Sequence, residues 1–437
     1  MFKITFMGAG STVFAKNVLG DLILLQRQTD YEIALYDIDN NRLEESYMML
    51  DYINKKYEGR ATIKKYTNRK EALTGANFIV NAIQVGGYEP CTVTDFEIPK
   101  KYGLRQTIAD TLGIGGIFRA LRTIPVLEDF ANDIHQVADK NALFINYTNP
   151  MAMLSKYLID NLNLNAVGLC HSVQACAKGL LETLDMQDYL PECKWEIAGI
   201  THQAWLLKIT DGKGNDLYPE IKRRSLSGEY KEKMGWDLVR HDMMHRFGYY
   251  ITESSEHTSE YTPWYIKQKY PELIQRYNIP LDEYPRRCVN QINGWQERKK
   301  SLLTDGVSHE VSNEFAAPII NAVLSDTPYR IHGNVMNNGL IDNLPQNACV
   351  EVPCLVDRNG ITPCKVGSLP EQLASLNRTN INVQNMTVQA AAERKKEYVY
   401  MAAYLDPHTA AELSLDDIKN MCDELFEAHK GWLPEYK

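Results

Sequence analysis

A cysteine and a histidine stand side by side in the segment GLCHSVQ (residues 168–174), and a second histidine follows in GITHQAW (residues 199–205). A thiolate and an imidazole are soft and borderline metal ligands. Cys170 and His202 could therefore bind one divalent transition metal and leave other positions open for substrate oxygens. The same residue types also occur as a buried thiol and a hydrogen-bonded core imidazole. Spacing alone favours that simpler interpretation, because no periodicity brings the two residues together.

The start of the chain has a pattern typical of dinucleotide binding. An apolar strand, KITFM, runs into the turn GAGST and then into a stretch with helical apolar spacing. Gly8 permits the tight turn, Gly10 lets the backbone approach a pyrophosphate, and Ser11 opens the helix whose free N–H groups would bind it. Val13 replaces the third glycine, which leaves a purely structural turn as the alternative. Asp37, after the second predicted strand, favours NAD, because a carboxylate there binds ribose hydroxyls and repels a 2′-phosphate.

Further polar motifs follow predicted strands. Gln84 opens QVGGYEP, and Asn149 lies in NYTNP. The segment at 103–126 is rich in glycine and arginine and contains Asp110 and Arg119. Open parallel sheets bind ligands at the carboxyl ends of their strands, so we expect these motifs to converge on one edge.

The order of the predicted elements indicates an α/β protein. Strands alternate with helices through residues 1–195, which predicts a Rossmann-like, doubly wound parallel sheet that binds NAD. Residues 196–437 are richer in aromatic and charged residues, and we expect there a second, α+β domain for substrate binding and oligomerisation, as in lactate and malate dehydrogenases. Within it, the patterns predict helices over 230–248 and 288–303 and strands within 348–367.

Composition excludes several classes of protein. The chain has 437 residues and a formal net charge of −9, which argues against a nucleic acid partner and against anionic membranes. No apolar run is long enough to span a membrane, and the first residues do not resemble a signal peptide. The nine cysteines show no close-spaced pattern, as expected for free thiols in a reducing compartment. We therefore expect a cytoplasmic protein.

Long motifs then carry a specific resemblance. GAGST, QVGGYEP, TLGIGGIFRALRTIPV, NYTNP, LCHSV, GITHQAW, SSEHTSEYTPWY and NGLIDNLPQNACVEVP occur in the order found in glycoside hydrolase family 4. The chain resembles most closely the α-galactosidase branch of that family, over nearly its whole length. This family departs from the usual scheme with two catalytic carboxylates.

The resemblance implies a glycosidase that uses NAD without consuming it. NAD takes a hydride from C3 of the sugar, a base removes the neighbouring C2 proton, and the C1 substituent is eliminated. Water then adds, and the hydride returns. A bound divalent metal, usually Mn²⁺ or else another transition metal, steadies the developing charge.

The resemblance also implies roles for particular residues. Cys170 and His202 are the expected metal ligands. Tyr261 is the expected base, with Tyr265 as the alternative. His171 occupies the position next to the metal cysteine, where some branches have an aspartate that acts as general acid. His171 is therefore expected either to donate a proton to the leaving oxygen or to support the residues around the metal.

A second set of implied roles concerns the sugar and the cofactor. Asp110 and Asn149 are expected to bind sugar hydroxyls, with Asp110 counted among the catalytic residues, and Arg119 to assist or to pair with a carboxylate. Gly8, Gly10, Ser11, Asp37 and Gln84 are the expected NAD contacts.

The sugar itself is less firmly indicated. The segment CHSV is similar to the α-galactosidase branch, and α-galacturonidase or α-glucosidase activity is the alternative within the family. A plain NAD-dependent 2-hydroxy-acid dehydrogenase would leave Cys170 and His202 without a task, and a non-catalytic NAD sensor would not need the polar strand ends. Family members are usually homodimers or homotetramers, so we expect one of these.

Overall fold

Twelve strands form one sheet within residues 1–304 and 308–437, which are the residues that the computed structural model describes. The strand order is β3-β2-β1-β4-β5-β6-β10-β11-β7-β8-β9, and β12 pairs with β11. The strands are β1 (Phe2–Met7), β2 (Tyr31–Tyr36), β3 (Ala61–Tyr66), β4 (Phe78–Asn81), β5 (Leu143–Asn146), β6 (Ala166–Gly168), β7 (Lys194–Ile200), β8 (Gln203–Thr210), β9 (Tyr250–Ile251), β10 (Tyr329–Met336), β11 (Cys349–Asp357) and β12 (Gly360–Pro363).

The first six strands are parallel and follow the order typical of dinucleotide-binding sheets. Their side chains alternate between two cores. In β4, Phe78 and Val80 enter one hydrophobic cluster, and Ile79 enters the other. Because both faces are covered, the inner strands β4 (FIVN) and β5 (LFIN) are almost entirely apolar, whereas the edge strand β3 (ATIKKY) is partly exposed. The predicted Rossmann-like, doubly wound sheet is confirmed.

The sheet continues beyond β6 with antiparallel strands from the second half of the chain. Asn334 in β10 pairs with Gly168 in β6, and Glu351 in β11 pairs with Gly199 in β7. The expected division between residues 195 and 196 lies within β7, and it stays a prediction. The strands expected within 348–367 are present as β11 and β12.

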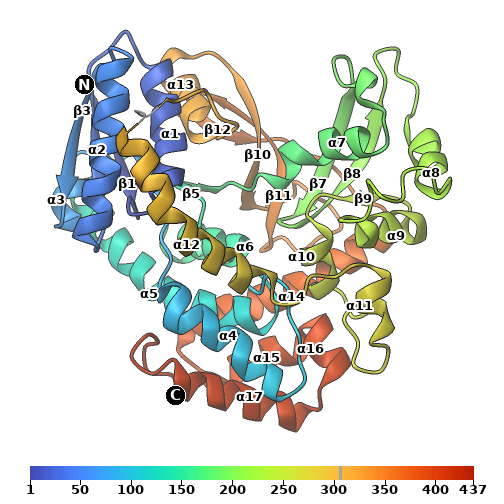
Figure 1. Cartoon of the computed structure of the whole chain (residues 1–437). Helices are drawn as coiled ribbons and strands as arrows, with labels where there is room; N and C mark the ends of the chain where they lie inside the picture. Colours follow the sequence, from blue (N-terminus) through green and yellow to red (C-terminus); the bar gives the residue numbers. More distant parts are fainter. Residues whose placement is uncertain (305–307) are drawn as a thin grey trace.

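Helices cover the sheet on both sides (Figure 1). One layer contains α1, α2 and α13, and the opposite layer contains α5 with the C-terminal helices α14, α15 and α17. The α-helices are α1 (Thr12–Leu25), α2 (Asn40–Lys56), α3 (Arg69–Leu73), α4 (Val93–Lys101), α5 (Gly113–Val137), α6 (Met151–Lys156), α7 (Ser172–Thr183), α8 (Tyr218–Leu226), α9 (Leu238–Phe247), α10 (Ser255–Glu260), α11 (Glu272–Arg276), α12 (Glu283–Thr304), α13 (Ala316–Ser325), α14 (Glu371–Glu393), α15 (Lys396–Leu405), α16 (Pro407–Glu412) and α17 (Leu415–Ala428).

One predicted helix is shorter than its pattern suggested. The expectation of a helix over 230–248 is wrong for residues 230–237, because α9 begins only at Leu238. Turns occupy the preceding residues, and the Asp237 N–H donates to the Met234 carbonyl at 2.7 Å. Gly235 lies inside this turn, and glycine disfavours continuing a helix. The helix expected over 288–303 is present as part of α12.

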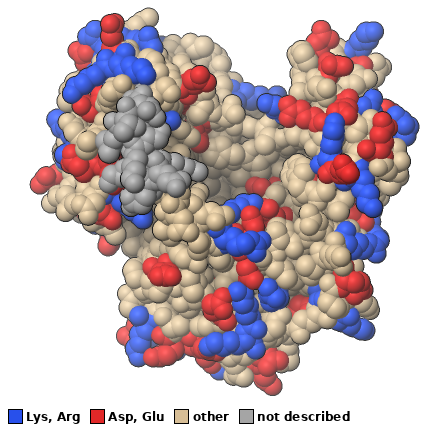
Figure 2. All heavy atoms as spheres, viewed as in Figure 1, with Lys and Arg blue, Asp and Glu red and all other residues tan. Residues whose placement is uncertain are grey.

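The arrangement leaves a recess between two parts of the molecule. Figure 2 shows the surface hollowed between the part that contains α1 and α2 and the part that contains α7 and α8. Helix α12 runs along this side of the molecule in Figure 1. Within the described residues, no helix is both long and apolar enough to cross a membrane.

Candidate active site

The turn between β1 and α1 has the conformation that dinucleotide binding requires. Gly8 has φ +89, and a Cβ there would lie 2.7 Å from the Ala82 carbonyl oxygen. The Gly10 N–H donates to Asp37 Oδ2 at 2.6 Å, and a Cβ on Gly10 would meet that same oxygen at 2.7 Å. Exposed Ser11 precedes α1 and makes no capping bond through its side chain. The helix terminus is thus left open for an anionic ligand.

The next strand ends lie on the same edge of the sheet. Gln84 follows β4, is exposed, and donates through Nε2 to Thr92 Oγ1 at 3.4 Å. Asn149 follows β5, and Cys170 follows β6. Because β4, β5 and β6 are parallel neighbours, their carboxyl ends meet as the sequence predicted.

Three of the predicted residues, buried Asp110 and Arg119 and half-buried Asn149, form a polar group. Asn149 Nδ2 donates to Asp110 Oδ2 at 3.0 Å, and Arg119 Nε donates to the Asn149 carbonyl at 3.2 Å. The Arg119 guanidinium also lies 3.5 Å from the Tyr284 hydroxyl, which comes from the first turn of α12. Burial raises the pKa of Asp110, but Arg119 together with nearby histidines outweighs burial and lowers it. Asp110 is therefore an ionised hydrogen-bond acceptor at this edge.

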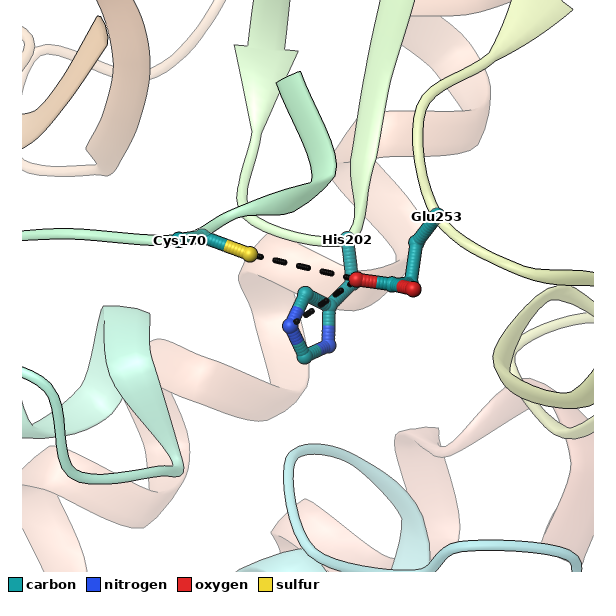
Figure 3. Close-up of side chains that lie close together, drawn as sticks. All are labelled: Cys170, His202 and Glu253. Carbon is teal, nitrogen blue, oxygen red and sulfur yellow. Dashed lines mark hydrogen bonds and ion pairs between the residues drawn. The ribbon is translucent and has the colours of Figure 1, made fainter. Parts of the chain in front are cut away.

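Buried Cys170 and His202 and the less buried Glu253 converge in a second group, which we call the Cys170 cluster. Their ligand atoms all lie within 4.8 Å of one another. Glu253 Oε2 is 3.9 Å from Cys170 Sγ and 3.5 Å from His202 Nε2. Figure 3 shows the three side chains pointing toward one another from the segment after β6, the turn between β7 and β8, and the segment after β9. Among the described residues, these three side chains lie close enough together to hold one metal ion.

The surroundings of the cluster oppose ionisation of the Cys170 thiol and favour ionisation of the Glu253 carboxyl. Burial raises the pKa of Cys170 well above the ordinary thiol value, and the carboxylates of Glu351 and Glu253 raise it further. Burial also raises the pKa of Glu253, but His202 and His257 outweigh burial and lower it. A thiolate beside a carboxylate in a buried site requires a compensating cation, and thiolate, imidazole and carboxylate are together a typical donor set for a divalent transition metal.

Tyr261 connects directly to this cluster. Its hydroxyl lies 2.8 Å from His202 Nδ1 and 2.9 Å from His257 Nδ1. Burial raises the pKa of Tyr261 well above its ordinary value, and Asp110 and Glu260 raise it further. Tyr265 lies elsewhere, because its hydroxyl donates to Asp242 at 2.8 Å. Of the two tyrosines that the sequence left open, the structure places Tyr261 at the site.

His171 faces a different neighbour. Its Nε2 lies 2.8 Å from Glu314 Oε2, and its ring packs between Tyr147 and Phe315. Burial lowers the pKa of His171, but the hydrogen bond and charge of Glu314 outweigh burial and raise it. The imidazole is half-exposed and can carry a proton near neutral pH.

The sequence predictions did not include two carboxylates at the site. Glu253 lies one residue before the motif SSEHTSEYTPWY, so the motif stopped short of it. Glu351 is fully buried in β11, where Asn334 donates to it at 3.3 Å, and burial raises its pKa to about 7. The signal for Glu351 was present as a single acid in the apolar stretch ACVEVP.

The fold and the site define an enzyme with a dinucleotide turn and a metal-type cluster on one sheet edge, and sequence comparison identifies the family. Residues 3–186 match the family 4 glycosyl hydrolases, and residues 197–409 match the family 4 glycosyl hydrolase C-terminal domain. The chain belongs to the family 4 glycosyl hydrolases. This membership confirms the resemblance and argues against the plain dehydrogenase.

Individual relatives and solved structures agree with this assignment. An α-galactosidase of Bacillus subtilis (strain 168) is 56% identical over 100% of both chains, and an α-galactosidase of Rhizobium meliloti (strain 1021) is 35% identical over 100% of this chain and 90% of its own. The fold is similar to a putative glucosidase from Bacillus subtilis, with a TM-score of 0.85 at 24% identity over 97% and 99% of the two chains. It is also similar to a 6-phospho-α-glucosidase from gut microorganisms, solved with NAD and Mn²⁺, with a TM-score of 0.80 at 21% identity over 100% of both chains. The fold is also similar to malate dehydrogenase from Plasmodium falciparum, with a TM-score of 0.54 at 13% identity over 91% of this chain and 100% of that one. The expected dehydrogenase-like fold is therefore confirmed.

Proposed function

We propose that this chain is an α-galactosidase that hydrolyses terminal α-galactosides with the help of NAD and a divalent metal, Mn²⁺ or another transition metal. The observation that carries the proposal is the buried Cys170 cluster bonded directly to the Tyr261 hydroxyl. A binding protein or a dehydrogenase has no need of this arrangement. The two relatives named as α-galactosidases support the choice of sugar, and the related structure with NAD and Mn²⁺ supports the cofactors.

The cluster residues fit a metal. Cys170, His202 and Glu253 would be its ligands, and His202 would bind through Nε2 because Nδ1 already faces Tyr261. A metal-bound histidine usually donates its other N–H to a fixed partner, which orients the ring. Here that partner is the Tyr261 oxygen.

The turn residues fit NAD. Gly8, Gly10 and Ser11 would hold the pyrophosphate at the α1 terminus, Asp37 would bind the ribose hydroxyls, and Gln84 would lie beside the cofactor on the neighbouring strand end. The 2.6 Å bond from the Gly10 N–H fixes the Asp37 carboxylate at the correct side of the turn. When bound, NAD would take a hydride from C3 of the sugar and later return it, while the metal would stabilise negative charge on the sugar oxygens.

The remaining steps belong to the chain itself. Tyr261 would remove the C2 proton, which is acidic enough only when C3 is a carbonyl carbon. Its own proton can leave through the hydrogen bond to His257 Nδ1, since the bond from His202 Nδ1 stabilises the phenolate. Asp110 and Asn149 would bind sugar hydroxyls, and Arg119 would hold both in place through the Asn149 carbonyl.

His171 would serve the leaving group. Glu314 stabilises its protonated form, so the ring can donate a proton to the leaving oxygen near neutral pH. The geometry also allows a supporting role, in which the pair of His171 and Glu314 only holds the start of α7 in place. Replacing His171 by Gln separates these roles, because substrates with a good leaving group such as 4-nitrophenol would lose little activity if the histidine is an acid.

A four-way omission assay tests the function. The protein, purified under reductant and stripped of cofactor and metal, is given 4-nitrophenyl α-galactoside with and without NAD⁺ and Mn²⁺. We expect turnover only with both additions and no net NADH. The α-galacturonide and α-glucoside serve as parallel substrates. Turnover without NAD⁺ would contradict the mechanism, and a preference for another glycoside would correct the sugar.

We further propose that the protein works in the cytoplasm as a homodimer or homotetramer. All nine cysteines are free, which suits a reducing compartment and an enzyme that needs the Cys170 thiol. Native mass spectrometry would give the number of subunits, and a monomer would contradict the proposed assembly.

A further inference from the structure

Glu260 makes an unusual set of bonds at the end of α10. Its carboxylate accepts the backbone N–H groups of three consecutive residues, Thr107 at 2.9 Å, Ile108 at 3.2 Å and Ala109 at 3.0 Å. The side chain is only 4% exposed. Three N–H groups that converge on one carboxylate form a strong, directional anchor, because bonds to a charged acceptor are stronger than neutral ones.

The anchored backbone leads directly to the sugar-binding side of the site. Ala109 has φ +52, a left-handed conformation that alanine rarely adopts. Such a conformation persists only where surrounding contacts impose it, and the Glu260 carboxylate bonds the Ala109 N–H itself. The next residue, Asp110, thereby faces Asn149, which donates to it at 3.0 Å.

The other end of the anchor is the proposed base. Glu260 directly precedes Tyr261, whose hydroxyl bonds His202 and His257. Asp110 and Tyr261 are far apart in the sequence, so noncovalent contacts alone fix how far apart they lie. Glu260 joins the two segments through its bonds to three N–H groups, and the Thr107 hydroxyl adds one bond to the Glu256 carbonyl at 2.8 Å.

We infer that Glu260 is a positioning residue, which ties the loop that carries Asp110 to the helix end that carries Tyr261. The inference rests on the proposed function of those two residues. With Glu260 in place, the group that binds sugar hydroxyls and the group that takes the C2 proton keep one fixed separation. A displacement of about 1 Å between such groups costs on the order of 100-fold in rate.

The test compares Glu260→Gln with Glu412→Gln. Glutamine keeps one acceptor oxygen but turns an NH₂ donor toward the N–H groups of the loop. Glu412 is a matched control, because its side chain is 5% exposed and it also accepts a backbone N–H, from Gln268 at 2.8 Å, outside the proposed site. Each variant is measured for kcat and KM on 4-nitrophenyl α-galactoside, for NAD⁺ affinity, and for amide hydrogen exchange of the peptide that covers 105–111.

We expect Glu260→Gln to lose about 100-fold in kcat per NAD-binding site. NAD⁺ affinity should be unchanged, and amides 107–109 should exchange faster. Glu412→Gln should resemble the wild type in kcat and in exchange of this peptide. If Glu260→Gln folds poorly, Glu260→Asp replaces it in the test. This variant keeps the charge, so its kcat and its amide exchange at 107–109 should lie between those of the wild type and those expected for the glutamine variant.

Two results would overturn the inference. One is unchanged exchange at 107–109, and the other is unchanged kcat per NAD-binding site despite faster exchange. If the wild type hydrolyses no α-galactoside, the proposed function fails by itself. The exchange experiment then still decides whether Glu260 anchors the loop. The value of kcat on whichever glycoside the wild type accepts decides whether that anchor matters for catalysis.

Discussion

The turn between β1 and α1 and the Cys170 cluster both lie where strands of one sheet end, but they are assembled differently. The turn uses neighbours in sequence, and what it offers a ligand is mainly backbone N–H groups at the start of α1. The Cys170 cluster uses three side chains that follow β6, β7 and β9, and two of these strands are antiparallel additions to the sheet.

This difference predicts how each region responds to substitution. A site made of backbone groups tolerates the loss of one side chain, because the N–H groups remain. A site made of three side chains in a buried space loses a ligand with each change and leaves the others uncompensated. We therefore expect substitutions in the Cys170 cluster to cost more than substitutions in the turn.

Cys170→Ser should have the largest effect. Loss of the thiolate removes a soft metal ligand, and we expect activity to fall on the order of 1,000-fold, since charge stabilisation by a metal contributes several kcal/mol. Titration with Mn²⁺ followed by electron paramagnetic resonance should show weaker binding. Cys176→Ser, at a buried thiol on α7, is the control. Equal Mn²⁺ affinity in both variants and the wild type would remove Cys170 from the ligand set.

Tyr261→Phe should cost on the order of 100-fold or more in kcat, which is the usual contribution of a general base. NAD⁺ affinity should change little, because the dinucleotide turn is untouched. Metal affinity should fall by about tenfold, because His202 Nδ1 loses the oxygen that orients its ring, so kcat is measured at saturating metal. Tyr265 bonds Asp242 and not the cluster, so Tyr265→Phe should have a kcat near that of the wild type. The reverse ranking of the two variants would give the base role to Tyr265.

Glu351→Gln should change stability in a pH-dependent way. Burial raises the pKa of Glu351 from 4.5 to about 7, so its ionisation opposes folding as the pH rises through this range. In metal-free protein the variant should therefore gain, relative to wild type, up to roughly 3 kcal/mol in the free energy of unfolding between pH 4.5 and pH 8. Urea unfolding at both pH values measures this difference. A gain that is the same at both values would show that folding does not shift the pKa of Glu351.

Asp37→Ala should have the smallest effect. The turn keeps its backbone N–H groups, so loss of the ribose contacts should weaken NAD⁺ binding by only about tenfold, the value of one hydrogen bond to a charged group. The preference for NAD⁺ over NADP⁺ should fall, because the repelling carboxylate is gone. Titration of both nucleotides by protein fluorescence measures this. A loss as large as that of Cys170→Ser would mean that the turn depends on its side chain as strongly as the cluster does.

Much of the fold was readable from the sequence because its signals are local. The apolar strands, the glycine turn at Gly8 and Gly10, and the acid at Asp37 predicted the parallel sheet and its dinucleotide edge. Long motifs such as TLGIGGIFRALRTIPV carried the resemblance to the family. The helix over 230–248 failed at its first part, because Gly235 and the turn to Asp237 compete with helical periodicity.

The sequence determined which residue types were present, and tertiary structure decided which of them meet. Nothing in the spacing of Cys170 and His202 required them to converge, and Glu253 joined them only because β9 pairs with β8 and delivers it there. The choice of Tyr261 over Tyr265 was likewise open, since the two residues are four apart and equally aromatic in their surroundings. Periodicity reports which face of an element is buried, whereas a site of side chains from separate strands depends on how those strands pair over long distances.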